Sequence, residues 1–243
     1  MDDVSAAKLL ISCLDLTSLN ETDDEERITA LCQKALTPYG NTAAVCVYPI
    51  FIPLAKRLLP AEVKTATVIN FPAGVPDINL MEKEIKNALS LGCDELDVVL
   101  PYRIFQNNDY NFCRKYLKQA RELTAEKTLK IIIETGELKT IDAIKKASLL
   151  CIEAKADFIK TSTGKTKISA TPEAANVILE TIKASGKNIG FKASGGIKNI
   201  TDAKAYLTLS QSVMGPNWAD KKRLRIGASS VLDNLLQTIT QGY

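Results

Sequence analysis

Two lysines of this sequence stand inside apolar runs, where a charged side chain is unusual. Lys160 lies within residues 157–164 (DFIKTSTG) and Lys192 within residues 189–194 (IGFKAS), and small residues follow each of them. Burial disfavours the charged form of an amine and lowers its pKa below the ordinary value of about 10.4. A neutral lysine attacks carbonyl carbons and forms a Schiff base. These two positions therefore indicate imine chemistry on an aldehyde or a ketone.

A third titratable residue accompanies the two lysines. If both lysines face the same side of a sheet from neighbouring strands, the strands lie about 4.8 Å apart, and each cation disfavours the charge of the other. Asp97 lies in another apolar run, and it faces the same side if Val99 does. Its carboxylate could accept and return the proton that imine chemistry moves. The alternative interpretation is a structural ion pair, in which Asp97 is the counter-ion of a buried lysine.

Glycines, hydroxyls and one further lysine follow three of the strand-like runs. These residues are Gly164, Lys165, Gly195, Gly196, Gly227, Ser229 and Ser230. Glycines let a backbone approach a phosphate closely, and backbone N–H groups at a helix N-terminus bind it. Each glycine taken alone is more often part of an ordinary turn. Three such groups at one edge of a sheet favour a pocket for an anion.

The sequence of 243 residues contains no histidine. This absence excludes Ser-His-Asp and Cys-His hydrolysis, and it excludes zinc or iron sites that depend on histidine. Acid–base work near neutral pH must therefore come from perturbed Lys, Asp, Glu, Cys or Tyr side chains. The six cysteines are widely spaced and form no CxxC pair, so most are expected to be small core residues.

The overall charge and the N-terminus bound the class of protein. The net charge is +3, from 31 basic and 28 acidic residues, which argues against a nucleic-acid-binding or membrane-surface protein. The densest basic cluster, residues 221–225 (KKRLR), is interpreted as a solvated turn before a strand. The N-terminus begins with two acids, unlike a signal peptide, and no apolar run approaches the roughly 18 residues of a membrane span. We expect a cytoplasmic protein.

The elements that must position these residues alternate along the chain. The strand-like runs are residues 43–48, 65–70, 95–100, 130–135, 158–163, 189–194, 210–214 and 224–229. Between them lie amphipathic segments with apolar residues at i, i+3 and i+4, such as 78–91, 110–123 and 141–152. This alternation is typical of parallel βαβ units, and strands that are apolar on both faces are typical of a sheet covered by helices.

The alternation predicts a single domain over residues 1–243, an α/β (β/α)8 TIM barrel. A helical extension occupies about residues 1–40 in this prediction, and the barrel and a C-terminal tail occupy residues 41–243. A doubly wound open sheet is the rival architecture. Its dinucleotide-binding form is disfavoured because Gly40 precedes the first expected strand and no GxGxxG motif follows it.

Several weaker candidates remain. Asp15 and Thr17 lie in a polar break, residues 14–20 (LDLTSLN), which either contacts substrate hydroxyls or only ends a helix. Lys130 begins an expected strand and is placed at the end far from the pocket. Asp94 and Glu95 are expected to be solvated at the start of the preceding strand-like run, residues 95–100.

Taken together, these motifs resemble the deoxyribose-phosphate aldolase family of class I aldolases. The matching stretches span nearly the whole chain in order: LDLTSLN (14–20), GNTAAVCVYP (40–49), NFPAG (70–74), ELDVVLPYR (95–103), IIIETGEL (131–138), DFIKTSTGK (157–165), GFKASGGI (190–197) and RIGASS (225–230).

The resemblance implies a TIM barrel that reversibly cleaves 2-deoxy-D-ribose 5-phosphate to acetaldehyde and D-glyceraldehyde 3-phosphate. It implies that Lys160 forms the Schiff base, that Lys192 lowers the pKa of Lys160, and that Asp97 is the acid and base. The phosphate loops of the family fall on Gly164, Lys165, Gly195, Gly196, Gly227, Ser229 and Ser230. Hydroxyl recognition falls on Asp15 and Thr17, with Lys165 sharing it, and a C-terminal proton shuttle falls on Tyr243.

The family needs no metal and no organic cofactor, and its partners are phosphorylated sugars and aldehydes rather than nucleic acids or membranes. We expect the assembly to be a homodimer. Two other functions stay open. One is a sugar-phosphate isomerase, or a different Schiff-base aldolase, on the same barrel. The other is a sugar-phosphate-binding protein without catalysis.

Overall fold

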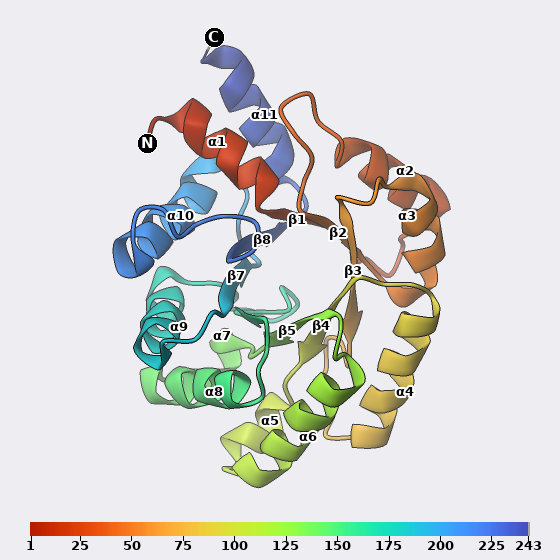
Figure 1. Cartoon of the computed structure of the whole chain (residues 1–243), viewed down its shortest axis with the longest axis vertical. Coiled ribbons are helices and arrows are strands. Elements are labelled where there is room, and N and C mark those ends of the chain that lie inside the picture. Colours follow the sequence, from red (N-terminus) through yellow and green to blue (C-terminus); the bar gives the residue numbers. More distant parts are fainter. Residues whose placement is uncertain (243) are drawn as a thin grey trace.

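The computed structural model describes residues 1–242, and it shows a closed parallel barrel inside a ring of helices (Figure 1). The strands, in barrel order, are β1 (Leu14–Thr17), β2 (Ala44–Val47), β3 (Lys64–Ile69), β4 (Glu95–Val99), β5 (Thr128–Ile132), β6 (Phe158–Lys160), β7 (Gly190–Ser194) and β8 (Leu224–Ala228). Strand β1 pairs with both β2 and β8, so the sheet closes. The predicted TIM barrel is confirmed, and the open sheet is wrong.

Apart from α1, which precedes β1, the helices follow the strands, and they cover the outside of the barrel (Figure 1). Their bounds are α1 (Asp3–Ser12), α2 (Glu25–Lys34), η1 (Pro49–Phe51), α3 (Ile52–Leu58), α4 (Ile78–Ser90), α5 (Tyr102–Gln106), α6 (Tyr110–Leu123), α7 (Thr135–Leu138), α8 (Ile141–Glu153), α9 (Pro172–Ser185), α10 (Ile200–Met214) and α11 (Val231–Gln241). Among residues 1–242, none of them has the length and apolar character that a membrane crossing requires.

Local chemistry determines where these helices begin and end. At α9, the side chain of Thr171 accepts a hydrogen bond from the backbone N–H of Ala174, and Pro172 occupies the first turn, where its missing N–H costs nothing. Gly186 ends the same helix with a φ of 64°, a left-handed conformation that favours glycine. These three features define the bounds of α9.

The strands alternate between two environments. On β1, Leu14 and Leu16 join the large apolar core between barrel and helices, whereas Asp15 and Thr17 have the opposite parity. On β2 and β3, four small apolar residues form a separate inner cluster, which comprises Ala44, Cys46, Ala66 and Val68 together with Leu19. One side of the barrel interior is therefore apolar, and charged residues are left for the other strands.

Two boundaries of the sequence prediction are wrong. The barrel begins at β1, inside the segment 1–40 that was predicted to be a helical extension, so only α1 precedes the barrel. Residues 210–214 were predicted to be a weak strand, but they continue α10. The reason is that Ser210 and Val213 extend the buried face begun by Ala203, Tyr206 and Leu207, at helical spacing.

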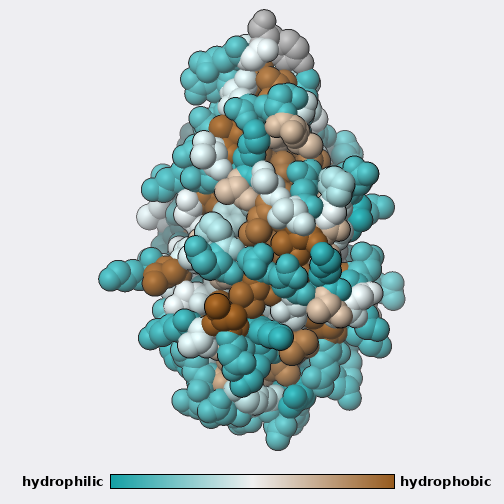
Figure 2. Space-filling view, turned by 90° about the vertical axis from the view of Figure 1, so that its left-hand side faces the viewer, coloured by the Kyte–Doolittle hydropathy of each residue, from teal (hydrophilic) through white to brown (hydrophobic). Residues whose placement is uncertain are grey.

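Helices α1 and α11 lie side by side, so the first and last parts of the described chain are neighbours (Figure 1). Seen from the left-hand side of Figure 1, the outer surface is mostly hydrophilic, with hydrophobic residues gathered towards its middle (Figure 2). The helix ring thus separates solvent from the barrel, and the site described below opens at the carboxyl ends of the strands.

Candidate active site

A cavity of about 270 Å³ lies at the carboxyl ends of the strands. It is lined by Thr17, Leu19, Asn20, Lys160, Thr163, Gly164, Lys165, Ser194, Gly195, Gly196, Ile197, Lys198, Gly227, Ala228, Ser229 and Ser230. Lys160, the last residue of β6, reaches it as a nearly buried side chain that is 4% exposed. All of the predicted anion-binding residues line this same cavity.

The two lysines of the apolar runs meet at one carboxylate. Lys160 and Lys192 are register partners on the neighbouring strands β6 and β7. Their Nζ atoms donate to the same oxygen, Oδ2 of Asp97, at 2.8 and 2.7 Å. Lys192 and Asp97 are fully buried. The predicted juxtaposition is thus present, although the catalytic roles of these residues stay predictions.

The pKa of Lys160 is lowered from its ordinary value. Burial is the largest cause, Asp97 opposes it, and the positive charge of Lys192 lowers the pKa further. The sequence argument had relied mainly on the neighbouring cation. In the structure, burial lowers the pKa of Lys160 more than the charge of Lys192 does, because the Lys160 side chain is only 4% exposed. An amine with a lowered pKa is the nucleophile that imine chemistry needs.

Lys192 has the opposite shift. Burial also opposes its charge, but Asp15 and Asp97 together outweigh burial and raise the pKa of Lys192. Burial likewise opposes the charge of Asp97, yet Lys130, Lys160 and Lys192 hold the pKa of that carboxyl well below its usual range. One amine is therefore easier to deprotonate, and the other keeps its proton.

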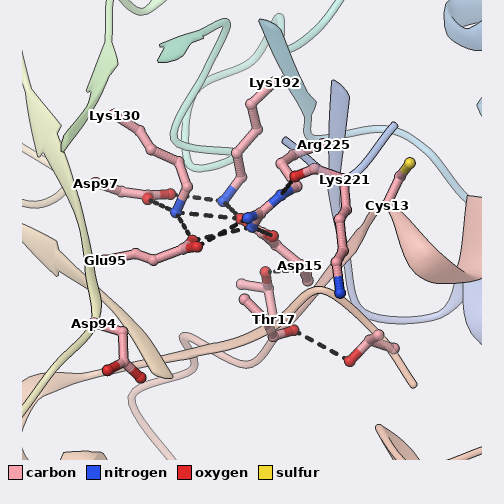
Figure 3. A network of polar contacts seen from close by, with 12 residues as sticks. Cys13, Asp15, Thr17, Asp94, Glu95, Asp97, Lys130, Lys192, Lys221 and Arg225 are labelled. Carbon is pink, nitrogen blue, oxygen red and sulfur yellow. Dashed lines mark hydrogen bonds and ion pairs between the residues drawn. The ribbon is translucent and has the colours of Figure 1, made fainter. Parts of the chain in front are cut away.

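Beneath the cavity, the charged side of the barrel is filled by an ion-pair network, much of it visible in Figure 3. Lys130 on β5 donates to Asp97 Oδ1 at 2.8 Å and lies 2.6 Å from Glu95 Oε2. Arg225 on β8 donates to Asp15 Oδ1 at 2.6 Å and to both oxygens of Glu95 at 2.8 and 3.0 Å. Lys192 donates to the second oxygen of Asp15.

Three sequence expectations are wrong at this network. Lys130 was placed at the end of its strand far from the pocket, Glu95 was expected to be solvated, and Arg225 was assigned to a solvated turn. All three are buried inside the barrel. A signal was present in the sequence, because Glu95 and Asp97 are two residues apart and so share one face of β4.

Asp15 and Thr17 differ in their access to the cavity. Asp15 is fully buried, and its oxygens pair with Arg225, Lys192 and Lys130, so no oxygen is left open to a substrate hydroxyl. This geometry argues against the expected hydroxyl recognition by Asp15 and favours its membership of the ion-pair network. Thr17 lines the cavity, and its hydroxyl donates to the carbonyl of Asp15 at 2.8 Å.

The glycine-rich side of the cavity has the features of an anion site. Gly195 has a φ of 85°, and a Cβ there would lie 2.5 Å from the Cβ of Ser169, so only glycine fits without strain. Ser230 is the N-cap of α11, and Ser229 precedes it. The N-terminus of α11, which carries the positive end of the helix dipole, therefore lies at the cavity rim.

Two residues fix the loop between β6 and α9. Lys165 Nζ donates to the carbonyl of Leu19 at 2.7 Å, which joins this loop to the one after β1. Glu134 lies between β5 and α7. Its carboxylate accepts from the hydroxyl of Thr163 at 2.5 Å and from the backbone N–H of the same residue. Tyr243, the predicted proton shuttle, lies outside the described residues.

Comparison with known proteins assigns this arrangement to a family. A family model described as DeoC/LacD family aldolase matches residues 9–232. The chain belongs to the DeoC/LacD family of aldolases. It is therefore an enzyme, a carbon–carbon lyase, and the deoxyribose-phosphate aldolase resemblance expected from the motifs is confirmed.

Solved structures agree with the family assignment. A protein of Coccidioides immitis with the provisional name deoxyribose-phosphate aldolase is 28% identical, with a TM-score of 0.85, over 98% of this chain and 87% of that one. A structure described as QR15, an aldolase, is 30% identical, with a TM-score of 0.83, over 96% and 97%. A tetrameric deoxyribose phosphate aldolase of Aeropyrum pernix, at 24% identity, shares the fold over 100% and 98%, with a TM-score of 0.77.

Proposed function

We propose that this DeoC/LacD family aldolase is a class I, Schiff-base enzyme that reversibly cleaves 2-deoxy-D-ribose 5-phosphate. The observation that carries the proposal is the position of Lys160. Its amine lies at the floor of a cavity whose rim is glycine-rich, and its pKa is lowered by burial and by Lys192. An amine of this kind beside a phosphate-sized anion site suits an aldehyde substrate with a phosphate at its other end.

The reaction begins with attack of the neutral Lys160 amine on C1 of the open-chain sugar. Loss of water from the carbinolamine gives an iminium, which withdraws electrons from the neighbouring carbons. When the C3 hydroxyl loses its proton, the C2–C3 bond breaks and its electron pair forms an enamine on Lys160. D-Glyceraldehyde 3-phosphate leaves, C2 of the enamine takes up a proton, and water then hydrolyses the iminium to acetaldehyde and free lysine.

Proton transfer in this scheme falls to Asp97 and Lys192. The carboxylate of Asp97 accepts a hydrogen bond from each lysine, so it lies within one transfer of the reacting nitrogen. Lys192 holds its proton because Asp15 and Asp97 outweigh its burial. It can therefore act as an acid where the carbinolamine loses water.

Trapping tests the proposal. The protein is incubated with acetaldehyde, reduced with borohydride and digested, and mass spectrometry locates any two-carbon adduct. We expect the adduct on Lys160. An active protein without any adduct would exclude the imine mechanism, whereas an adduct confined to another lysine would move the nucleophile.

A second candidate is a Schiff-base aldolase with a different phosphorylated substrate. The breadth of the DeoC/LacD family favours keeping it, and the trapping experiment does not separate the two. Turnover with 2-deoxy-D-ribose 5-phosphate, set against turnover with longer and with 2-hydroxylated sugar phosphates, does so. The homodimer stays a prediction, which light scattering of the purified protein would test.

A further inference from the structure

The proposed reaction leaves one buried ion pair without a task. Arg225 and Glu95 are 6% and 2% exposed, and neither lines the cavity. The guanidinium donates to both oxygens of Glu95, and its Nε donates to the carbonyl of Lys221 at 2.5 Å. Removing one partner of such a pair is costly, but a neutral pair of similar size often replaces it without loss of stability. Stability alone therefore does not explain why the pair is here.

The pair is connected to the reacting groups through two residues. Arg225 holds Oδ1 of Asp15, which leaves the other oxygen of Asp15 for Lys192. Glu95 lies 2.6 Å from Lys130, which donates to Asp97 Oδ1. The first route therefore reaches Lys192 and the second reaches Asp97, the two side chains beside Lys160.

The charges of this network do not cancel if every group is ionised. Three carboxylates face four basic groups, namely Asp15, Glu95, Asp97, Lys130, Lys160, Lys192 and Arg225. Neutralising one amine would balance the charges. Among the three lysines, Lys160 is the one that reaches the cavity, so it can exchange its proton with water or substrate.

We propose that the Glu95–Arg225 ion pair is a positioning element of the aldolase, which orients Asp15 and Lys130 and thereby sets the charge around Lys160. This inference rests on the proposed function only for its role in catalysis. The two side chains touch no reacting atom. They act at a distance through the low dielectric of the barrel interior, where charges interact more strongly than in water.

Other groups also face Lys160, and they must stay unchanged in a test. They are Cys46 on β2, Asp97 on β4, Lys130 on β5, Glu134 after β5, Lys192 on β7 and, through these, Asp15 on β1. The test therefore changes only Glu95 and Arg225, one charge at a time and then both.

The measurement is competitive acetylation of the purified protein with acetic anhydride across pH, in which peptide mass spectrometry gives an apparent pKa for each lysine. Arg225→Met removes a positive charge, so the pKa of Lys160 should rise by about half a unit or more. Glu95→Gln removes a negative charge, so the pKa should fall. The double variant restores the net charge but not the contacts that hold Asp15 and Lys130, so the pKa should stay displaced from the unmodified value. Arg225→Lys keeps the charge and should displace the pKa less than Arg225→Met does.

Controls separate this effect from a general loss of structure. Arg223→Met removes a partly exposed arginine that pairs with Asp220, and it should leave Lys160 unshifted. Acetylation of Lys118, whose side chain is 79% exposed, should be the same in every variant. If Arg225→Met does not fold, as judged by thermal unfolding, Glu95→Gln decides alone: a lowered pKa of Lys160 supports the proposal, and an unchanged or raised pKa overturns it.

Shifts of opposite sign in the single variants, together with a double variant that stays displaced, support the proposal. A double variant that returns to the unmodified value would show that the two charges act on Lys160 without holding Asp15 and Lys130, and it overturns the positioning role. No shift, or shifts of one sign, overturns it. The acetylation readout does not depend on turnover. An inactive protein with opposite shifts would therefore refute the proposed function and leave the electrostatic inference standing, whereas an active protein without shifts would do the reverse.

Discussion

At the scale of single residues, the site depends on two amines that share one carboxylate oxygen but differ in proton affinity. Lys160 lies at the cavity floor with a lowered pKa, whereas Lys192 is enclosed by Asp15 and Asp97 and has a raised one. The asymmetry comes from the number of carboxylates around each amine. We propose that this asymmetry makes Lys160 the nucleophile and Lys192 the acid.

Replacing the nucleophile tests the first role. Lys160→Ala should lower kcat for cleavage by about a thousandfold or more, because no imine can form. The fold should survive, since the deletion also removes a buried amine with a costly charge. Circular dichroism and kcat together check this expectation, and near-native activity in a folded variant would refute the assignment.

Replacing the acid tests the coupling. Lys192→Met removes a positive charge beside Lys160 and leaves Asp97 freer to hold the proton of Lys160, so both effects raise the pKa of Lys160. The amine must be neutral to react. The acidic limb of the kcat/KM profile should therefore move to higher pH, by about one unit or more. An unmoved limb would show that the two amines are not coupled.

At the scale of elements, much of the site was predictable because strand ends mark it. Lys160 and Lys192 lie inside apolar runs and the glycine loops follow these runs, so all of them face the carboxyl edge of the parallel strands. Strand β1 was missed because we expected strands to be apolar on both faces, and two of its four residues, LDLT, are polar. Its inward face joins the charged side of the barrel, so it looked like a break between helices.

The ion-pair network was missed for a related reason. Sequence reasoning assigns charged residues at strand starts to solvent, and this is the usual outcome. Glu95 and Arg225 are exceptions because they neutralise each other inside the barrel. Such pairing joins residues 130 positions apart in the chain, a relation that no local pattern contains.

The start of α11 carries a prediction of its own. Ser230→Asp places a carboxylate at the rim where the helix dipole favours an anion, so it should repel a substrate phosphate. KM for 2-deoxy-D-ribose 5-phosphate should rise by about tenfold or more. Unphosphorylated 2-deoxyribose should be little affected, and Ser230→Ala is the matched control. Equal effects on both sugars would argue against a phosphate site here.

At the scale of the whole molecule, the network couples the barrel to pH. Burial opposes the charge of Asp15, but Lys192, Lys130 and Arg225 outweigh it and depress the pKa of this carboxyl below its ordinary value. A depressed carboxyl pKa gives stability that is present above the unfolded pKa of about 3.9 and is lost as pH falls through the folded pKa. The barrel should therefore lose stability progressively below about pH 4.

Asp15→Asn tests this linkage. At pH 7 the free energy of unfolding of the variant should be lower by about 3–5 kcal/mol, because Lys192 and Arg225 lose a buried partner. Its stability should also fall less steeply between pH 4 and 2 than that of the unmodified protein. Urea unfolding at each pH measures both effects. Parallel curves for the two proteins would show that Asp15 does not carry the acid sensitivity.

The barrel closes between its first and last strands through non-covalent contacts. Strand β8 hydrogen-bonds to β1, α11 packs on α1, and Gly242 lies against Val4. The order of the βα units along the chain therefore does not determine the structure of the barrel. In a circular permutant, a short peptide joins the two ends of the chain, and the chain is opened on the opposite side of the barrel. Such a permutant would form the same cavity from a different first strand.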